Sequence, residues 1–155
     1  MDNPRHKLGG KFKNINNAFE RSLNHSLAEL DITSSQSFLL GYIVQHDEKP
    51  PCQHDIEVRF NIKHPTATGI LKRLAAKGFV VFLPDENDKR LKRVLATDTG
   101  REASKKVTAS LDYVDSKFSS VLTSEELECL NNILDKLILN SDELFETVER
   151  KNAND

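Results

Sequence analysis

Short polar and cationic side chains follow one another at helical spacing between positions 64 and 72. They are His64, Thr66, Thr68 and Lys72, and Pro65 stands where a helix would begin. Proline suits the first helical position, because its missing N–H has no partner there and its φ is already set. Hydroxyls and cations near a helix N-terminus can reach phosphates and base edges, and the helix dipole favours phosphate. These four side chains are candidate contacts to a DNA major groove.

A second charged group lies between two apolar stretches, residues 79–83 and 92–96. It consists of Asp88, Lys89, Arg90, Lys92 and Arg93. An arginine carried by a loop can enter the narrow minor groove of DNA, where the negative potential is enhanced, and Asp88 can orient the guanidinium of Arg90. The three other cations would hold phosphates. Alternatively, Asp88 and Arg90 form only a surface pair that stiffens the loop, worth less than about 1 kcal/mol.

The distribution of charge agrees with a basic centre. The formal net charge of the 155-residue chain is −2, so the total charge does not indicate a nucleic-acid partner. Residues 63–93, however, hold eight Lys and Arg against three acids, a formal charge of +5. Residues 121–155 hold three Lys and Arg against nine acids, a formal charge of −6. We therefore expect the centre, and not the C-terminal part, to meet phosphate.

Two helices and a hairpin must position these side chains. A short helix is predicted between Cys52 and Phe60, then a turn at Asn61, which tolerates positive φ. The second helix runs from His64 to a left-handed cap at Gly78. Residues 79–83, a loop over 84–90 and residues 92–96 then form a β-hairpin. This order predicts a mostly α fold with a small antiparallel β wing, a winged helix-turn-helix.

Amphipathic helices are predicted on both sides of this unit. Apolar residues recur every three or four positions over residues 8–30, and Thr33 with Gln36 forms a capping box for a following helix. After the wing, Thr97 or Asp98 would cap a long helix with an apolar stripe. A second capping box over 123–126 precedes the last stripe: Leu127, Leu130, Leu134, Leu137, Ile138, Leu144, Phe145 and Val148.

The central stretch resembles the MarR family of bacterial transcription regulators. The matching positions are residues 62–68, Leu74, Lys77-Gly78-Phe79-Val80, Asp88-Lys89-Arg90 and residues 95–100. The family pattern is roughly Gly-Leu-Ile, then Asp-x-Arg, then Leu-Thr-x-x-Gly. Two positions depart from it: Ala96 replaces the usual Leu, and Leu83 stands where a basic residue is common. The second departure would weaken a phosphate contact, whereas the flanking segments fit, so the resemblance covers nearly the whole chain.

The resemblance implies a homodimer held by the first and last helices of two chains. Residues 1–32 would be an N-terminal dimerisation helix, 33–97 the winged helix-turn-helix DNA-binding domain, and 98–155 C-terminal dimerisation helices. A two-fold protein suits a palindromic operator in double-stranded DNA, and a repressor is the expected role. The alternative is that the terminal helices form an intramolecular bundle in a monomer.

The resemblance further implies control by a small anionic or phenolic effector. Phe19, Phe38 and Tyr42 are candidates to line its crevice, and the alternative, which their apolar character favours, is that they are core residues. Two other classes of protein remain open. A winged helix that serves as a protein-interaction module does not need a basic wing, and a non-specific architectural DNA binder would prefer no palindrome.

Other chemistry finds little support in the sequence. Cys52 and His54, with His46 nearby, could ligate a metal or sense oxidants, but structural zinc needs four ligands and no second cluster lies near. We predict no metal site, no cofactor and, without a Ser-His-Asp set or a Gly-rich phosphate loop, no enzyme. Two cysteines are too few for a disulfide framework, and no apolar run suits a signal peptide or membrane span, so a cytoplasmic protein is expected.

Overall fold

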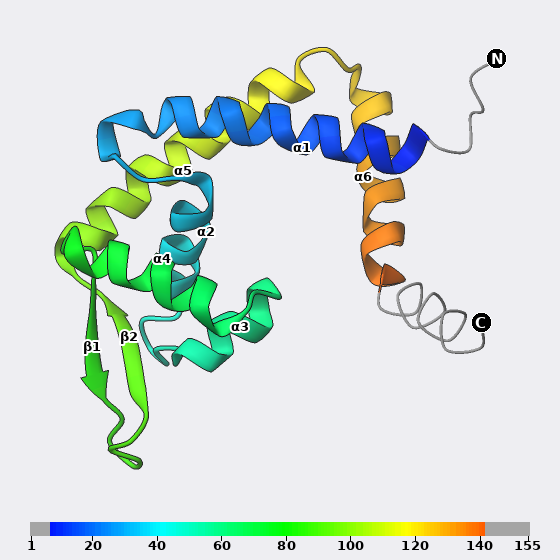
Figure 1. The fold of residues 1–155 in the computed structure, drawn as a ribbon. Coiled ribbons are helices and arrows are strands. Elements are labelled where there is room, and N and C mark those ends of the chain that lie inside the picture. The colour runs from blue at the N-terminus through cyan, green and yellow to red at the C-terminus, as the bar shows by residue number, and fades with distance from the viewer. Residues whose placement is uncertain (1–6, 142–155) are drawn as a thin grey trace, which may run out of the picture. The chain divides into compact units, whose positions relative to one another are not determined.

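A computed structural model describes residues 7–141 of the chain. The elements are α1 Lys7–Ser26, the 3-10 helix η2 Ala28–Leu30, α2 Ser34–Gln45, α3 Gln53–Phe60, α4 His64–Ala76, β1 Val80–Pro84, β2 Lys92–Ala96, α5 Asp98–Ser119 and α6 Ser124–Leu139 (Figure 1). The chain divides into two compact units, Met1–Asp115 and Ser116–Asp155. The predicted fold class, mostly α with one small antiparallel wing, is confirmed. Over residues 7–141, no helix is both long and apolar enough to cross a membrane.

The first predicted helix is broken before its end. The apolar spacing suggested one helix over residues 8–30, but α1 ends at Ser26 and a single 3-10 turn, η2, follows. Asp31 then takes a left-handed conformation with φ 50°, which an aspartate tolerates better than a branched residue. The helical spacing continues through this turn because a 3-10 turn keeps nearly the same side-chain period, and the sequence pattern did not distinguish the two.

The two halves of α1 differ in burial. Leu23 and Leu27 near its C-terminal end are fully buried, so this end of the helix belongs to the core of the first unit. Leu8, Phe12 and Ile15 near its N-terminal end are exposed apolar side chains. A helix with buried residues at one end and apolar exposed residues at the other has one half that its own unit does not cover.

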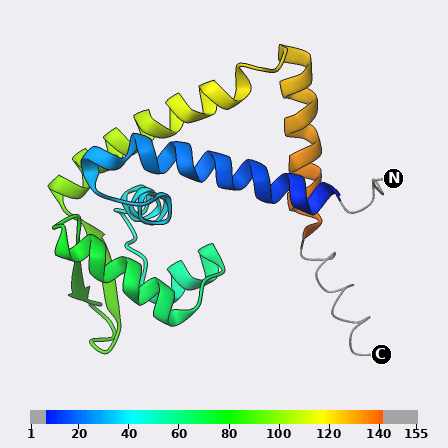
Figure 2. The same ribbon diagram turned by 45° about the horizontal axis from the view of Figure 1, so that its top comes forward.

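Helix α2 begins at the predicted capping box and forms the centre of the first unit. The hydroxyl of Thr33 accepts the backbone N–H of Gln36 at 3.4 Å, and the Gln36 side chain accepts the Thr33 N–H at 3.2 Å. Leu39, Leu40 and Ile43 are buried. In Figures 1 and 2, α2 lies between α1 on one side and the α3–α4 pair on the other. The core therefore lies around α2.

The helix-turn-helix forms as the turn residues predict. The backbone N–H of Cys52 donates to Asp55 at 2.8 Å and so caps α3, and Asn61 ends α3 with φ 48°. Ile56 of α3 and Leu71 of α4 are fully buried, and α3 and α4 are in contact. Burial of one apolar stripe on each helix fixes which face of α4 remains outside.

The wing is a two-stranded antiparallel hairpin extended by a third short segment. Val80 pairs with Ala96 and Pro84 with Lys92 at the two ends of the ladder. The predicted strand over 79–83 is thus shifted by one residue, because Pro84 still fits at the end of an edge strand. On the edge of β2 that does not pair with β1, the Val94 N–H donates to the Pro51 carbonyl at 2.8 Å, which ties the wing to the segment before α3.

Two glycines and a threonine join the end of α4 to the start of α5. Gly78 has φ 73°, as predicted for a left-handed cap. The Thr97 hydroxyl donates to the Gly78 carbonyl at 2.6 Å and accepts the Gly100 N–H at 2.9 Å, so Thr97 caps α5. A Cβ on Gly100 would lie 2.0 Å from the Phe79 carbonyl oxygen. The Thr-x-x-Gly motif therefore has a structural reason, a cap followed by a close backbone contact.

The second unit contains α6. Thr123 and Glu126 form the predicted capping box, with the Thr123 N–H donating to Glu126 at 2.9 Å. None of the residues of α6 is buried, and its exposed apolar side chains are Leu130, Ile133, Ile138 and Leu139. Three residues of the predicted apolar stripe are half-buried, namely Leu127, Leu134 and Leu137, and three others, Leu144, Phe145 and Val148, lie outside the described residues.

Candidate nucleic-acid interface

The outer face of α4 carries the predicted groove-facing residues. Ala67, Ile70, Leu71 and Leu74 turn toward the core. The opposite face therefore holds the polar residues, of which His64, Thr66 and Lys72 are exposed and Thr68 is half-buried. Two residues that the sequence reasoning left out share this face, the exposed Arg73 and the half-buried Gly69.

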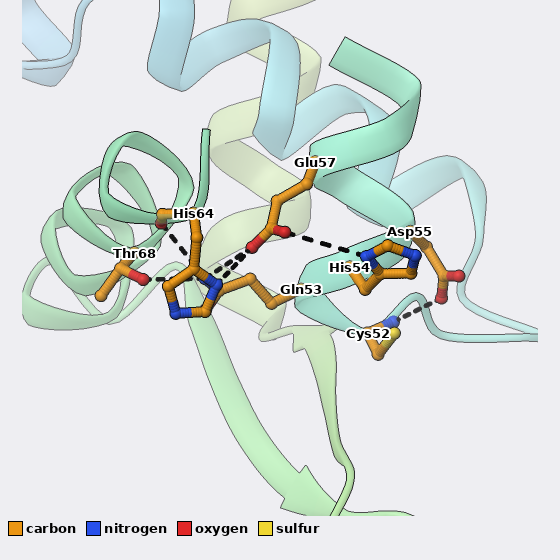
Figure 3. Close-up of polar contacts among 7 residues, drawn as sticks. All are labelled: Cys52, Gln53, His54, Asp55, Glu57, His64 and Thr68. Carbon is orange, nitrogen blue, oxygen red and sulfur yellow. Dashed lines mark hydrogen bonds and ion pairs between the residues drawn. The ribbon is translucent and has the colours of Figure 1, made fainter. Parts of the chain in front are cut away.

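Helix α3 holds two of these side chains in a polar cluster, formed by Gln53, Glu57, His64 and Thr68 (Figure 3). The Gln53 side-chain amide donates to the Thr68 hydroxyl at 2.7 Å and to Glu57 at 2.9 Å. His64 Nδ1 donates to the same Glu57 oxygen at 2.7 Å. The pKa of Glu57 is lowered, first by the Gln53 hydrogen bond and then by His64, so the carboxylate stays ionised.

Gln53 and Glu57 were not predicted as site residues. They stand one helical turn apart on α3, which could have marked them as a polar strip beside the buried Ile56. Nothing in the local pattern, however, shows that this face meets α4 at Thr68, 15 residues later. The contact depends on how the two helices cross, which is set by packing.

The tip of the wing presents Arg90. Its guanidinium lies 3.1 Å from Asp88 and its side chain is 93% exposed. The Arg90 N–H also donates to Asp88 at 3.0 Å, and the pKa of Asp88 is lowered chiefly by the Arg90 side chain. The geometry joins the predicted pair, while Lys89 and Lys92 are exposed beside it.

Arg93 lies in a different environment from the other wing cations. Its guanidinium is 2.6 Å from Asp85, donates to the Pro50 carbonyl at 3.2 Å and lies 3.6 Å from Asp55. Asp85 in turn accepts the backbone N–H groups of Asn87 and Asp88. Arg93 thus joins the wing loop to the segment before α3, and its predicted role in phosphate binding stays a prediction.

The cations of this surface differ in whether they already have partners. Arg90 and Arg93 pair within the wing, and Lys77 pairs with Asp31. Within residues 7–141, five others form no ion pair: Lys63, Lys72, Arg73, Lys89 and Lys92. Side chains on α4, before it and in the wing therefore keep positive charge available to an external anion.

A cavity of about 550 Å³ lies between α2, the end of α3 and α5. Two of the three residues proposed for an effector crevice, Phe38 and Tyr42, line it, whereas Phe19 is half-buried and is not part of this lining. The polar side of the lining includes Arg59 and Arg101. The Arg101 guanidinium lies 2.7 Å from Asp47 and 2.9 Å from Asp98.

The three residues that could have formed a metal site, His46, Cys52 and His54, each make a different contact. His46 Nδ1 donates to the Tyr42 carbonyl at 2.8 Å, Cys52 caps α3, and His54 lies 3.8 Å from Glu57. Among residues 7–141, no three His, Cys, Asp or Glu side chains come together in an arrangement that could hold a metal ion.

A helix-turn-helix followed by an antiparallel hairpin, between flanking helices, defines a winged helix-turn-helix protein. The MarR family model matches residues 30–91, which span most of this unit. The uncharacterized HTH-type transcriptional regulator YybA of Bacillus subtilis (strain 168) is 27% identical over 142 residues, covering 91% of this chain and 93% of YybA.

Two solved structures superpose on this chain along most of its length. MepR of S. aureus, in a complex with DNA, superposes with a TM-score of 0.80 at 26% identity, covering 86% of this chain and 97% of MepR. A mutant of E. coli MarR, in a complex with operator DNA, superposes with a TM-score of 0.76 at 27% identity, covering 84% of this chain and 92% of that one. The chain is thus similar to the MarR family of transcriptional regulators over its central residues 30–91, and the relatives extend this likeness to most of its length.

Proposed function

We propose that this protein is a MarR-family transcriptional regulator that binds double-stranded DNA sequence-specifically, as a homodimer on a palindromic operator. The observation that carries the proposal is the joint surface of α4 and the wing, where five cations form no ion pair within residues 7–141. The DNA complexes of MepR and MarR support the same assignment by likeness. Lysine and arginine at such a surface release counterions from DNA, so affinity falls steeply with salt.

Each part of the surface would have its own role. His64, Thr66, Thr68 and Lys72 would approach base edges and phosphates in the major groove, since an α-helix fits there. Arg90, held by Asp88, would enter the adjacent minor groove. The exposed Lys89 and Lys92 would contact phosphates, which set the register of the protein on DNA.

A homodimer would cover the apolar faces left exposed in both units. Leu8, Phe12 and Ile15 of α1 are exposed, and α6 has several exposed apolar residues and none that is buried. An amphipathic helix with its apolar face in water is unfavourable, because each buried apolar side chain contributes roughly 1.5–3 kcal/mol. A second copy of the chain would bury these faces and give the two-fold symmetry of a palindrome.

We further propose repression that a small anionic or phenolic molecule relieves. The cavity between α2 and α5 offers Phe38 and Tyr42 as ring contacts and Arg59 as a cation. A ligand would release DNA only if it prefers a conformation in which the two α4 helices do not match the half-sites. Thermal shifts with benzoate and salicylate, in wild type and a Gly41→Leu variant that fills the cavity, test this part.

A selection from random duplex DNA tests the main proposal. The expected result is a two-fold palindrome, bound by one dimer as judged from the molar mass of the complex. Binding without an enriched sequence, but with a strong salt dependence, would instead indicate an architectural binder. No binding at low salt would contradict DNA binding and favour a protein-interaction module.

A further inference from the structure

The Gln53 side chain lies between α3 and the outer face of α4. Its amide nitrogen is 2.7 Å from the Thr68 hydroxyl oxygen and 2.9 Å from Glu57 Oε1 (Figure 3). The same nitrogen lies 3.0 Å from His64 Nδ1 and 3.4 Å from the His64 carbonyl oxygen. An amide nitrogen has two hydrogens, so its two shortest contacts, to Thr68 and Glu57, are the bonds it makes best.

Glu57 determines which way the Gln53 amide is turned. An ionised carboxylate only accepts hydrogen bonds, and His64 Nδ1 also donates to this oxygen at 2.7 Å. With the amide reversed, the Gln53 carbonyl oxygen would face the negatively charged carboxylate oxygen at 2.9 Å. That repulsion involves a full charge, so it exceeds the one between the Gln53 amide and the neutral His64 Nδ1–H, which lie 3.0 Å apart. The nitrogen therefore points to Glu57, and the same nitrogen is then turned toward Thr68.

The orientation of Gln53 determines the role of the Thr68 hydroxyl. Its oxygen accepts from Gln53, so its own hydrogen must be directed to another acceptor. Among residues 7–141 this hydrogen has no acceptor, although a helical threonine often donates to the carbonyl one turn earlier. That carbonyl, on His64, instead faces the Gln53 amide at 3.4 Å.

We infer that Gln53 is a positioning residue for sequence recognition, which makes Thr68 a hydrogen-bond donor toward the major groove. This inference rests on the proposed function. A donor at Thr68 selects a base with an acceptor in the major groove, namely N7 or O6 of guanine, N7 of adenine or O4 of thymine. It disfavours cytosine, because the N4 amino group is itself a donor: it could bond only to the second lone pair of the Thr68 oxygen and would leave the Thr68 hydrogen without an acceptor.

A double-mutant cycle on the selected operator tests the inference. Thr68→Val removes the hydroxyl at nearly constant shape, and Gln53→Met removes the amide at similar length. At the base pair that Thr68 contacts, each single variant is expected to lower the preference for the selected base over cytosine by roughly tenfold, the effect of one hydrogen bond to a base. The double variant should lose no more of this base preference than Thr68→Val alone.

A second variant and a stability control separate positioning from folding. Glu57→Gln keeps the shape but no longer requires the Gln53 nitrogen to face residue 57, so it should also relax the base preference. The measured quantity is the ratio of the affinities of one variant for two duplexes, one with the selected base and one with cytosine. The lost charge of Glu57 changes both affinities equally and leaves their ratio unchanged. Unfolding temperatures of all variants show whether the fold persists.

The possible outcomes are distinct. The inference would be overturned if Gln53→Met lowered the base preference by the same factor in the Thr68→Val variant as in wild type. An unchanged base preference in both Gln53→Met and Glu57→Gln would also overturn it. If wild type itself selects no sequence, the proposed function fails together with the inference, whereas a selective wild type with additive variants leaves the function intact.

Discussion

Gly69 lies in the middle of α4 on the face that carries Thr66 and Lys72. A glycine inside a helix lowers stability by about 1 kcal/mol relative to alanine, through backbone entropy. Nothing lies within 4 Å of where its Cβ would be, so the fold does not require a glycine there. The missing side chain instead allows another molecule to come close to the helix backbone, which suits a helix that enters a groove.

Gly69→Ala is therefore expected to stabilise the protein and weaken DNA binding. The free energy of unfolding should rise by about 0.5–1 kcal/mol, and operator affinity should fall because the methyl group holds DNA away. Denaturant unfolding and a fluorescence-anisotropy titration measure the two quantities. Gly41→Ala is the matched control, since Gly41 also lies in a helix with nothing within 4 Å but faces the cavity. Equal DNA affinity of wild type and Gly69→Ala would refute the close approach.

Arg90 makes a second prediction at this scale. Because its side chain is 93% exposed, Arg90→Ala should leave the unfolding temperature nearly unchanged. Operator affinity should fall roughly ten- to a hundredfold, the effect of one arginine contact to DNA. Arg90→Lys keeps the charge without the planar fork, so it should recover only part of the loss. Normal operator binding by Arg90→Ala would refute the role of the wing tip.

The loop of the wing depends on the carboxylate of Asp85, directly after the end of β1. The pKa of Asp85 is lowered from 3.8 to about 2, first by the Asp88 N–H, then by Arg93 and the Asn87 N–H. A carboxyl with a lowered folded pKa stabilises the fold above its unfolded pKa, and this contribution disappears as the pH falls through the folded pKa. The Asp85 contribution is therefore complete above about pH 4 and lost near pH 2.

Asp85→Asn should accordingly destabilise the wing at pH 7. The unfolding temperature should drop relative to wild type, and the difference should shrink as the pH falls from 4 toward 2. Hydrogen exchange of residues 85–91 locates the effect. Glu86→Gln, the exposed neighbour, is the control and should show no such difference. A difference in unfolding temperature between Asp85→Asn and wild type that stays constant down to pH 2 would contradict this account.

At the scale of elements, local chemistry predicted most boundaries. Capping boxes at Thr33 and Thr123, the turn at Asn61 and the cap at Gly78 all act within four residues, and all are confirmed. The break after Ser26 was missed, because apolar spacing alone does not separate an α-helix from a 3-10 turn. Local signals therefore predict a boundary where a capping or turn residue marks it, and miss one for which apolar spacing is the only guide.

The candidate site shows the limit of sequence reasoning more clearly. The outer face of α4 follows from its own spacing, and Asp88 with Arg90 are two residues apart. Gln53 and Arg93 each have a partner in a distant segment, which is Thr68 for Gln53 and, 43 residues earlier, Pro50 for Arg93. Such contacts depend on helix crossing and strand pairing, so a single sequence without its fold does not reveal them.

For the whole molecule, the main prediction concerns the exposed apolar face of α6. Ile133 is 52% exposed, so Ile133→Asp should not disturb the chain's own fold. If this face lies in a homodimer, the buried charge should produce monomers by light scattering and weaken binding to a palindrome. Asn132→Asp adds the same charge at the adjacent exposed position and should stay dimeric. An intact Ile133→Asp dimer would show that the interface lies elsewhere.

The contact of Gly100 with the Phe79 carbonyl implies a constraint that differs from the one at Gly69. Consider a library in which positions 41, 69 and 100 each carry all amino acids and which is selected only for folding. Nearly all selected variants should have glycine at position 100, because any Cβ there would lie 2.0 Å from the Phe79 carbonyl oxygen. Positions 41 and 69 should accept alanine in that library. A second selection, for operator binding, should restore glycine at 69 but not at 41. Comparing the two selections would thus separate glycines that the fold requires from those that recognition requires.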